Sequence, residues 1–98
     1  MSEKKDRNLV LTTICLRVLR TTSLTATESR ILWHLASTLS VAGEIVSISL
    51  IGKEVLIDAA NVNRVIKHLC ELGFLMRGPK LGVSYHYKLN PAYFKIIS

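Results

Sequence analysis

Apolar residues recur at helical spacing between Asp58 and Gly73, in the stretch DAANVNRVIKHLCELG. Asp58 is a favourable N-cap, and Gly73 stands where a left-handed C-terminal residue is favoured, with no Gly or Pro between them. The apolar positions fall on one helical face: Val62, Val65, Ile66, Leu69 and Leu72. The pattern predicts an amphipathic helix that turns one face to a core and the other to a polar partner.

Two longer helices are predicted earlier in the chain. Residues 9–20, LVLTTICLRVLR, are apolar around most of a helical circumference, so this first helix must be covered on more than one side. We favour a second copy of the chain as the additional cover. The alternatives are a central core helix in a monomer, or a strand, because Val, Ile and Thr are frequent here. Thr25 and Glu28 fit a capping box at the start of a second helix, expected over residues 26–40.

A short helix is expected directly before the amphipathic one. It covers residues 50–57, with Ser49 as its cap and Gly52 as a weakening residue in its interior. A tight turn at Ile57 and Asp58 then joins the two helices. Together they predict a helix-turn-helix, in which the first helix braces the second against a DNA groove.

Short strands are predicted around these helices. Residues 44–49, EIVSIS, alternate apolar residues with serine, and residues 74–78 and 83–90 form a hairpin around a turn at 79–82. One face of the second hairpin strand carries Val83, Tyr85, Tyr87 and Leu89. The opposite face carries Ser84, His86 and Lys88. Residues 91–98 are expected to form a helical turn or short helix, with three apolar side chains available for packing: Tyr93, Phe94 and Ile97.

Length and composition suit one small domain. The chain has 98 residues, of which 49% are hydrophobic, and this is ample for a core. We therefore expect a single α+β domain over residues 9–98, preceded by a charged, flexible segment at residues 1–8. No stretch approaches 18 apolar residues, and no signal-peptide apolar region precedes Leu9. The expected location is the cytoplasm.

The basic charge is concentrated in the C-terminal part of the chain. The net charge is +6, and residues 59–98 carry six Lys or Arg against the single acidic residue Glu71. Such a one-sided field favours a nucleic-acid partner, and the alternative is a charged surface with no polyanionic partner. A membrane surface is disfavoured because the basic residues are spread over a helix, a turn and a strand.

The polar face of the predicted 58–72 helix carries side chains suited to DNA. Asn bonds adenine bidentately, Arg bonds guanine, and Lys holds phosphate. The candidates are Asn61, Asn63, Arg64 and Lys67, with small Ala59 and Ala60 allowing close approach to the groove. The hairpin adds four basic residues for phosphates or the adjacent minor groove: Arg77, Lys80, His86 and Lys88. The alternatives are an ordinary solvated helix face and a purely structural hairpin.

Catalytic and metal-binding patterns are not evident. Cys15 and Cys70 are isolated on apolar stretches and are expected to be buried thiols, and no Cys/His spacing suggests zinc. His34 has neither a nearby nucleophile nor a second ligand, so we expect a surface or satisfied core histidine. No phosphate loop, HExxH motif or nucleophile with an obvious base occurs, so no enzyme activity and no cofactor are predicted.

The order of predicted elements over about residues 9–90 resembles the winged-helix DNA-binding proteins. LTATESRILWHL, at 24–35, is similar to the second-helix segment of MarR-type regulators, and DAANVNRVIKHLCELGFLMR, at 58–77, resembles the recognition-helix segment of such domains. The resemblance implies a winged helix-turn-helix fold with Asp58 as the cap, Val62 in the core and Asn61 on phosphate. It also implies three residues facing DNA: Asn63, Arg64 and Lys67.

The C-terminal segment resembles plasmid and phage replication proteins of the RepL kind. The resemblance rests on a strand closing in YxxNP plus an aromatic residue, here Tyr87, Asn90, Pro91 and Phe94. The chain has Leu56 and Ile57 where a turn Gly often stands, and it lacks the extra helices through which MarR proteins dimerise. MarR-like dimerisation and small-ligand sensing are therefore not implied.

Two classes of function follow. The first is sequence-specific binding of double-stranded DNA in plasmid or phage replication or in transcriptional regulation. In it the 58–72 helix lies in the major groove, the 76–88 wing lies on the backbone, and a homodimer through residues 9–20 binds an inverted repeat. The second is a winged-helix module that docks protein instead of DNA. Duplex RNA remains a further possibility, although the chain has no RRM or KH signature.

Overall fold

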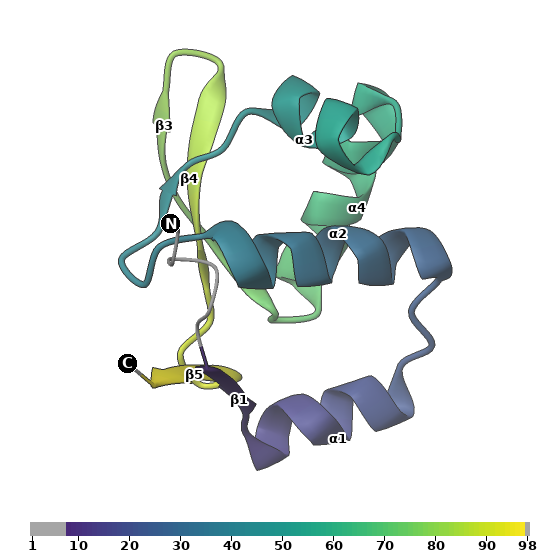
Figure 1. Cartoon of the computed structure of the whole chain (residues 1–98), viewed down its shortest axis with the longest axis vertical. Coiled ribbons are helices and arrows are strands. Elements are labelled where there is room, and N and C mark those ends of the chain that lie inside the picture. Colours follow the sequence, from purple (N-terminus) through teal and green to yellow (C-terminus); the bar gives the residue numbers. More distant parts are fainter. Residues whose placement is uncertain (1–7, 98) are drawn as a thin grey trace.

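Four helices and five strands make up the computed structural model, which describes residues 8–97 (Figure 1). In chain order these are β1 (Asn8–Leu11), α1 (Thr13–Thr21), α2 (Ala26–Thr38), β2 (Glu44–Ile45), α3 (Ile48–Val55), α4 (Ala59–Glu71), β3 (Leu75–Leu81), β4 (Ser84–Leu89) and β5 (Phe94–Ile97). The chain is an α+β domain, as predicted. The expected flexible segment lies outside the described residues at 1–7, but its last residue, Asn8, is in β1.

The strands form two separate antiparallel sheets. One has the order β2-β4-β3 and contains the predicted hairpin, and the other pairs β1 with β5. In the second sheet Asn8 lies opposite Ile97 and Leu11 lies opposite Phe94. The first and last described segments therefore lie side by side, in the lower part of Figure 1 above α1.

The core lies between α2 and α4. In Figure 1, α2 crosses the middle of the molecule, with α1 on one side and α3 and α4 on the other. The buried side chains of α2 are Ile31, Leu32, Leu35 and Ala36, and those of α4 are Val62, Val65, Ile66 and Leu69. Phe74, directly before β3, is also fully buried. The apolar face predicted for the 58–73 segment is therefore confirmed, with Leu72 partly buried at its end.

The predicted caps of α2 and α4 are also confirmed. The Thr25 hydroxyl accepts a hydrogen bond from the Glu28 backbone N–H, and the Glu28 carboxylate accepts one from the Thr25 N–H, completing the capping box. The Asp58 carboxylate accepts from the Asn61 N–H over 2.9 Å. Gly73 has a φ of +93°. These local signals place both helices within one or two residues of the prediction.

The first predicted helix is wrong at its N-terminal end. Residues 9–11 form strand β1, and the helix begins only at Thr13, with Thr12 as its cap. The Thr12 N–H donates to the Tyr93 carbonyl and the Thr12 hydroxyl donates to the Ala92 carbonyl. Pairing with the C-terminal segment therefore decides the conformation of residues 9–11, and a local pattern does not contain this information.

The predicted C-terminal helical turn is present at residues 90–93, where the Phe94 N–H donates to the Asn90 carbonyl, but the prediction is wrong for Phe94–Ile97 for the same reason. After a turn at residues 90–93, the chain enters β5, in which Phe94 is buried and Ile97 is about half exposed. Asn90 holds this turn: its side-chain amide donates to the Gly73 carbonyl and its side-chain oxygen accepts from the Ala92 N–H. The YxxNP segment thus attaches the C-terminal strand to the end of α4.

Two further boundaries differ from the prediction. The strand expected over residues 44–49 is only Glu44–Ile45, because Ser47 instead of Ser49 caps α3 and the helix starts at Ile48. The hairpin turn is at Gly82 and Val83 instead of 79–82, since Pro79 stays in β3 beside an irregularity between Arg77 and Lys80. A proline is tolerated there because β3 is an edge strand.

Candidate nucleic-acid interface

Helix α3 and helix α4 are joined by three residues, 56–58, and pack closely. A Cβ atom on Gly52 would lie 2.6 Å from the Ile57 carbonyl oxygen, so glycine is needed where the turn crosses α3. The Ile57 N–H donates to the Gly52 carbonyl over 2.9 Å. Leu56 is left-handed, with φ of 61°, and its side chain is 84% exposed. The turn therefore fixes the direction in which α4 leaves α3.

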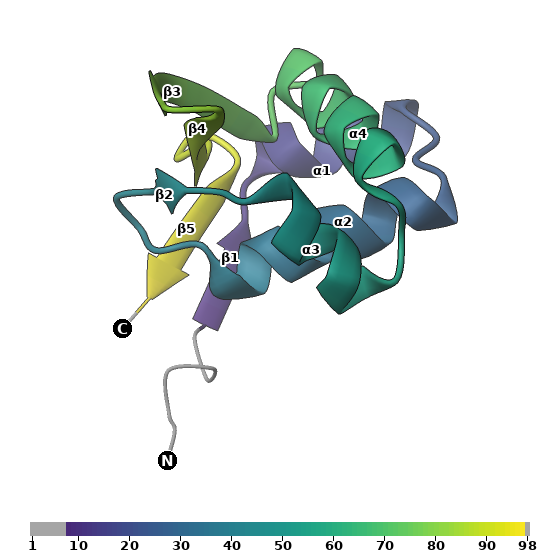
Figure 2. The same cartoon turned by 90° about the horizontal axis from the view of Figure 1, so that it is seen from above.

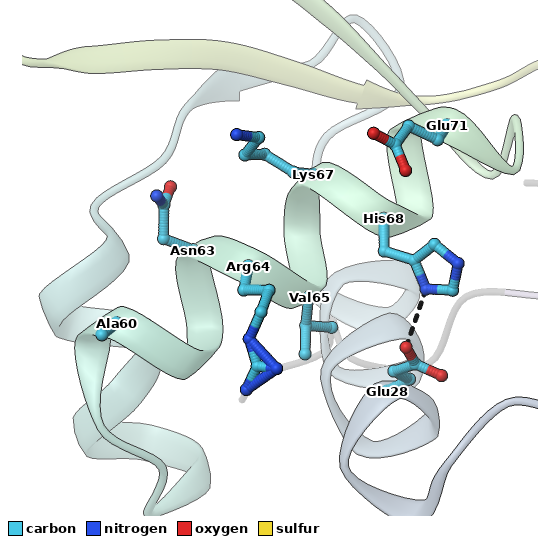
Figure 3. Close-up of a pocket in the computed structure, with 8 residues that line it drawn as sticks. All are labelled: Glu28, Ala60, Asn63, Arg64, Val65, Lys67, His68 and Glu71. Carbon is cyan, nitrogen blue, oxygen red and sulfur yellow. Dashed lines mark hydrogen bonds and ion pairs between the residues drawn. The ribbon is translucent and has the colours of Figure 1, made fainter.

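The outer face of α4 exposes the side chains predicted from the sequence. Ala60, Asn63, Arg64 and Lys67 are all exposed. They border a hollow of about 460 Å³ that is also lined by Glu28, Val65, His68 and Glu71. Figure 3 shows Asn63 and Lys67 pointing to one side of α4 and Arg64 pointing to another. A partner that enters this hollow meets the Asn63 amide and the cations of Arg64 and Lys67.

Asn61 is placed differently from the other polar residues of α4. It is partly buried, and its side-chain amide donates to the Asp58 carboxylate over 2.6 Å. Its side-chain oxygen accepts a hydrogen bond from the Arg64 guanidinium. The hydrogen bond from the Asn61 backbone N–H lowers the pKa of Asp58. The chain Asp58, Asn61, Arg64 therefore holds the guanidinium near the start of α4, and the Asn61 side chain is not free as the phosphate prediction assumes.

A polar contact ties α4 to α2 below the same face. His68 Nδ1 lies 2.7 Å from a carboxylate oxygen of Glu28 (Figure 3, dashed line). The pKa of Glu28 is lowered, first by the hydrogen bond from the Thr25 backbone N–H and also by His68. One carboxylate thus caps α2 and holds α4, which links the cap predicted from sequence to the position of the exposed face.

The β3–β4 hairpin brings two cations to the same side of the molecule. The Arg77 guanidinium carbon is 4.5 Å and the Lys80 ammonium nitrogen 5.5 Å from the centre of the Tyr85 ring. Both distances are within the range of cation–π attraction. A second hollow, of about 350 Å³, lies between the hairpin and α4 and is lined by Lys67, Cys70, Glu71, Arg77 and Tyr87. In Figure 2, α4 and β3 both lie along the upper side of the molecule.

His86 and Lys88 are not brought to this side. Tyr87 pairs with Arg77 and Tyr85 pairs with Lys80, so these four side chains share one face of the hairpin. Because side chains alternate along a strand, His86 and Lys88 lie on the other face. The His86 ring packs against the backbone of Gly43 and Gly78. The four basic hairpin residues, predicted from the sequence to contact DNA together, therefore lie on two different faces of the hairpin.

Tyr85 is the residue of this face that the sequence interpretation missed. The alternation of side chains predicts only the hairpin face on which Tyr85 lies, yet Tyr85 is partly exposed and both cations of β3 stack on its ring. The signal that identifies it is cross-strand register, because Lys80 lies directly opposite Tyr85. That register depends on the irregularity between Arg77 and Lys80, which moves Lys80 onto the face of Arg77.

The remaining candidate residues have structural surroundings. Cys15 is fully buried and Cys70 partly buried, both are free thiols, and burial raises the pKa of each. His34 Nε2 lies 2.9 Å from a Glu54 carboxylate oxygen, which ties α2 to α3. Within residues 8–97 no group of three or more His, Cys, Asp or Glu is placed to hold a metal ion. None of the helices described is long and apolar enough to span a membrane.

Comparison with known proteins finds no family model that matches this chain and no curated protein whose sequence matches it. The functional assignment therefore rests on the residues and geometry of the chain itself.

Proposed function

We propose that this chain is a winged-helix protein that binds specific double-stranded DNA, in plasmid or phage replication or in transcriptional regulation. The observation that carries the proposal is the shared position of Lys67 on α4 and Arg77 on the hairpin, which line one hollow on one side of the molecule. Helix α4 enters the major groove and the hairpin is the wing. Both elements then meet a single polyanion.

The polar residues of α4 contact different parts of the DNA in this proposal. Asn63 and Lys67 are exposed on one side of the helix and suit base edges and phosphate. Arg64 is exposed and held by Asn61, so its guanidinium is partly preorganised for a bidentate contact. The small side chain of Ala60 leaves room for close approach at the start of the helix. The acidic Glu71 lies at the other end of the same face and opposes phosphate there.

The wing supplies contacts to the backbone through Arg77 and Lys80. Their stacking on Tyr85 limits the conformations of two long side chains, so less entropy is lost when they meet phosphates. His86 and Lys88, on the opposite face of the hairpin, have a smaller role in this arrangement.

A homodimer is part of the proposal. Helix α1, in the segment predicted to form the dimer, exposes the apolar side chains Ile14 and Leu16, at 49% and 43%. Because they are two residues apart, they lie on different sides of the helix, and burial of either one against a second copy would remove apolar surface from water and would pair two α4 helices for an inverted repeat. The exposed apolar side chains of α1 also favour the second candidate function, a module that docks another protein. DNA binding that weakens steeply with salt separates the two functions.

The test is a fluorescence anisotropy titration against random duplex and against a duplex selected from a random library, at several salt concentrations. We expect Asn63→Ala and Arg64→Ala to cost about 1–3 kcal/mol on the selected duplex and much less on the random one. Arg77→Ala and Lys80→Ala should weaken both equally and lower the salt slope by about 1 each.

Lys95→Ala is the matched control. Lys95 is an exposed cation on β5, outside the face shared by α4 and the wing, and its removal changes the net charge as much as Lys80→Ala does. An equal loss of binding with Lys95→Ala and Lys80→Ala would show that net charge alone attracts DNA. No binding of either duplex at low salt would contradict the proposal and favour the protein-docking module.

A further inference from the structure

The tip of the β3–β4 hairpin is apolar and almost fully exposed. Leu81 is 68% and Val83 is 93% exposed, on either side of Gly82, and the turn consists of Gly82 and Val83 alone because Leu81 pairs with Ser84. A Cβ atom on Gly82 would have no heavy atom within 4 Å. Nothing in the described part of the chain covers these two side chains.

This turn is a tight one. Gly82 has a φ of +64° and stands at the first central position of a two-residue hairpin loop, where a type II′ turn favours glycine. Such a turn continues the twist of the two strands, so the tip moves with them. The hydrogen-bonded pairing of β3 with β4 therefore holds Leu81 and Val83 in place at the end of the hairpin.

The stem below the tip is cationic. From Leu75 to Leu89 the chain has three Lys or Arg residues and no Asp or Glu. Arg77 and Lys80 are stacked on Tyr85 on the face of the hairpin that turns toward α4. An apolar tip on a positively charged stem matches a partner that has an apolar interior between two rows of negative charge.

We infer that the hairpin tip is an apolar wedge for the minor groove of duplex DNA, with Leu81 and Val83 against the sugars and base edges, and Arg77 and Lys80 on the flanking phosphates. This inference rests on the proposed DNA-binding function. The minor groove of B-DNA is about 6 Å wide, too narrow for a hairpin with its side chains but open to a two-residue turn. Apolar side chains inserted there partly unstack a base step and bend the duplex, typically by about 20–90°.

Duplex DNA is favoured over an anionic membrane because of the position of Lys67. This α4 cation lines the same hollow as Arg77, between the helix and the hairpin. A partner that contacts both Lys67 and Arg77 must enter the concave space between α4 and the hairpin. An adjacent part of the same partner must then contact the hairpin tip. Adjacent major and minor grooves have this form, whereas a flat bilayer surface reaches only the tip.

The experiment measures DNA bending by energy transfer between dyes at the two ends of the selected duplex. A second series places 2-aminopurine at successive positions of the same duplex, because its fluorescence rises when a base unstacks. The test variant is Leu81→Ser with Val83→Thr, which removes the apolar character of the tip. The matched control is Val41→Thr, since Val41 is 71% exposed in the loop between α2 and β2.

The unaltered protein should bend the duplex and brighten 2-aminopurine at one flanking step. The tip variant should lose both signals and about tenfold or more in affinity, because burial of either one of its two substituted side chains accounts for a tenfold effect. The Val41→Thr variant should keep both signals. All substituted side chains are exposed, so thermal unfolding of the variants should match that of the unaltered protein.

The possible failures are distinguishable. A tip variant that bends the duplex as the unaltered protein does would overturn the wedge and leave the proposed function intact. Salt-sensitive binding without bending or 2-aminopurine brightening, in the unaltered protein and in the variants, would also overturn the wedge and leave the proposed function intact. No binding to any duplex at low salt would overturn both. Sedimentation with phosphatidylglycerol vesicles, lost in the tip variant, would then assign the tip to a membrane surface.

Discussion

Leu56, in the turn before α4, has a backbone conformation that favours glycine. Its φ is 61° and its side chain is 84% exposed, in the turn between α3 and α4. The left-handed conformation costs a residue with a Cβ atom about 1–2 kcal/mol. Glycine avoids this cost but loses about 0.5–1 kcal/mol more backbone entropy on folding. The Leu56→Gly variant should therefore be about 0.5–1 kcal/mol more stable than Leu56→Ala.

The side chain itself contributes little to this balance. Full burial of a leucine contributes about 1.5–3 kcal/mol, so the sixth of Leu56 that is buried contributes roughly 0.3–0.5 kcal/mol. Leu56→Ala should lose about that amount relative to the unaltered protein. Leu56→Gly should match the unaltered protein or exceed it slightly. Since both variants remove the same side chain, the difference between them isolates the backbone term.

The assay is urea unfolding followed by circular dichroism, supported by thermal melts. A difference of about 0.5–1 kcal/mol corresponds to roughly 2–8 °C in the melting temperature of a domain of this size. Equal melting temperatures for the two variants, or a higher value for Leu56→Ala, would refute the reasoning. Binding of the selected duplex should be unchanged in Leu56→Gly, because the turn keeps the same path between the helices.

Two further predictions concern the elements that hold α4. Gly52→Ala should destabilise the domain by about 1–3 kcal/mol in the same urea assay, because the new methyl group would lie 2.6 Å from the Ile57 carbonyl oxygen, and an unchanged midpoint would contradict this close approach. Glu28→Gln should make the free energy of unfolding fall less steeply as the pH is lowered. The pKa of Glu28 is lowered on folding, so its contribution is present above the ordinary glutamate pKa and is lost as pH falls through the lower value of the folded state. Urea midpoints measured from pH 7 to pH 3 should converge for the two proteins at the acid end, and parallel curves would contradict the prediction.

Local signals were sufficient for the two helices that form the core. Asp58 and Gly73 delimit α4, and the Thr25–Glu28 capping box starts α2. In both cases the hydrogen-bond partners lie within a few residues, so a short window of sequence contains the interaction. The apolar face of α4 is equally local, because its residues recur with the period of the helix itself.

Long-range pairing decided the two ends of the described chain. Residues 9–11 have a pattern that fits a helix or a strand, and Phe94–Ile97 fit a helical turn as well. They are strands because each supplies the backbone hydrogen bonds of the other, across more than 80 residues. The tertiary structure brings β1 and β5 together, and the sequence of either strand alone does not identify the other as its pairing partner.

The candidate interface shows the same division. The sequence by itself determined which residues of α4 are polar, and that the C-terminal part of the chain is basic. Only the tertiary structure decided that Arg77 and Lys80 stack on Tyr85 beside α4 and that His86 and Lys88 lie on the other hairpin face. Residue type is a property of one position, whereas a shared surface depends on strand register, on an irregularity in β3 and on the packing of one element against another.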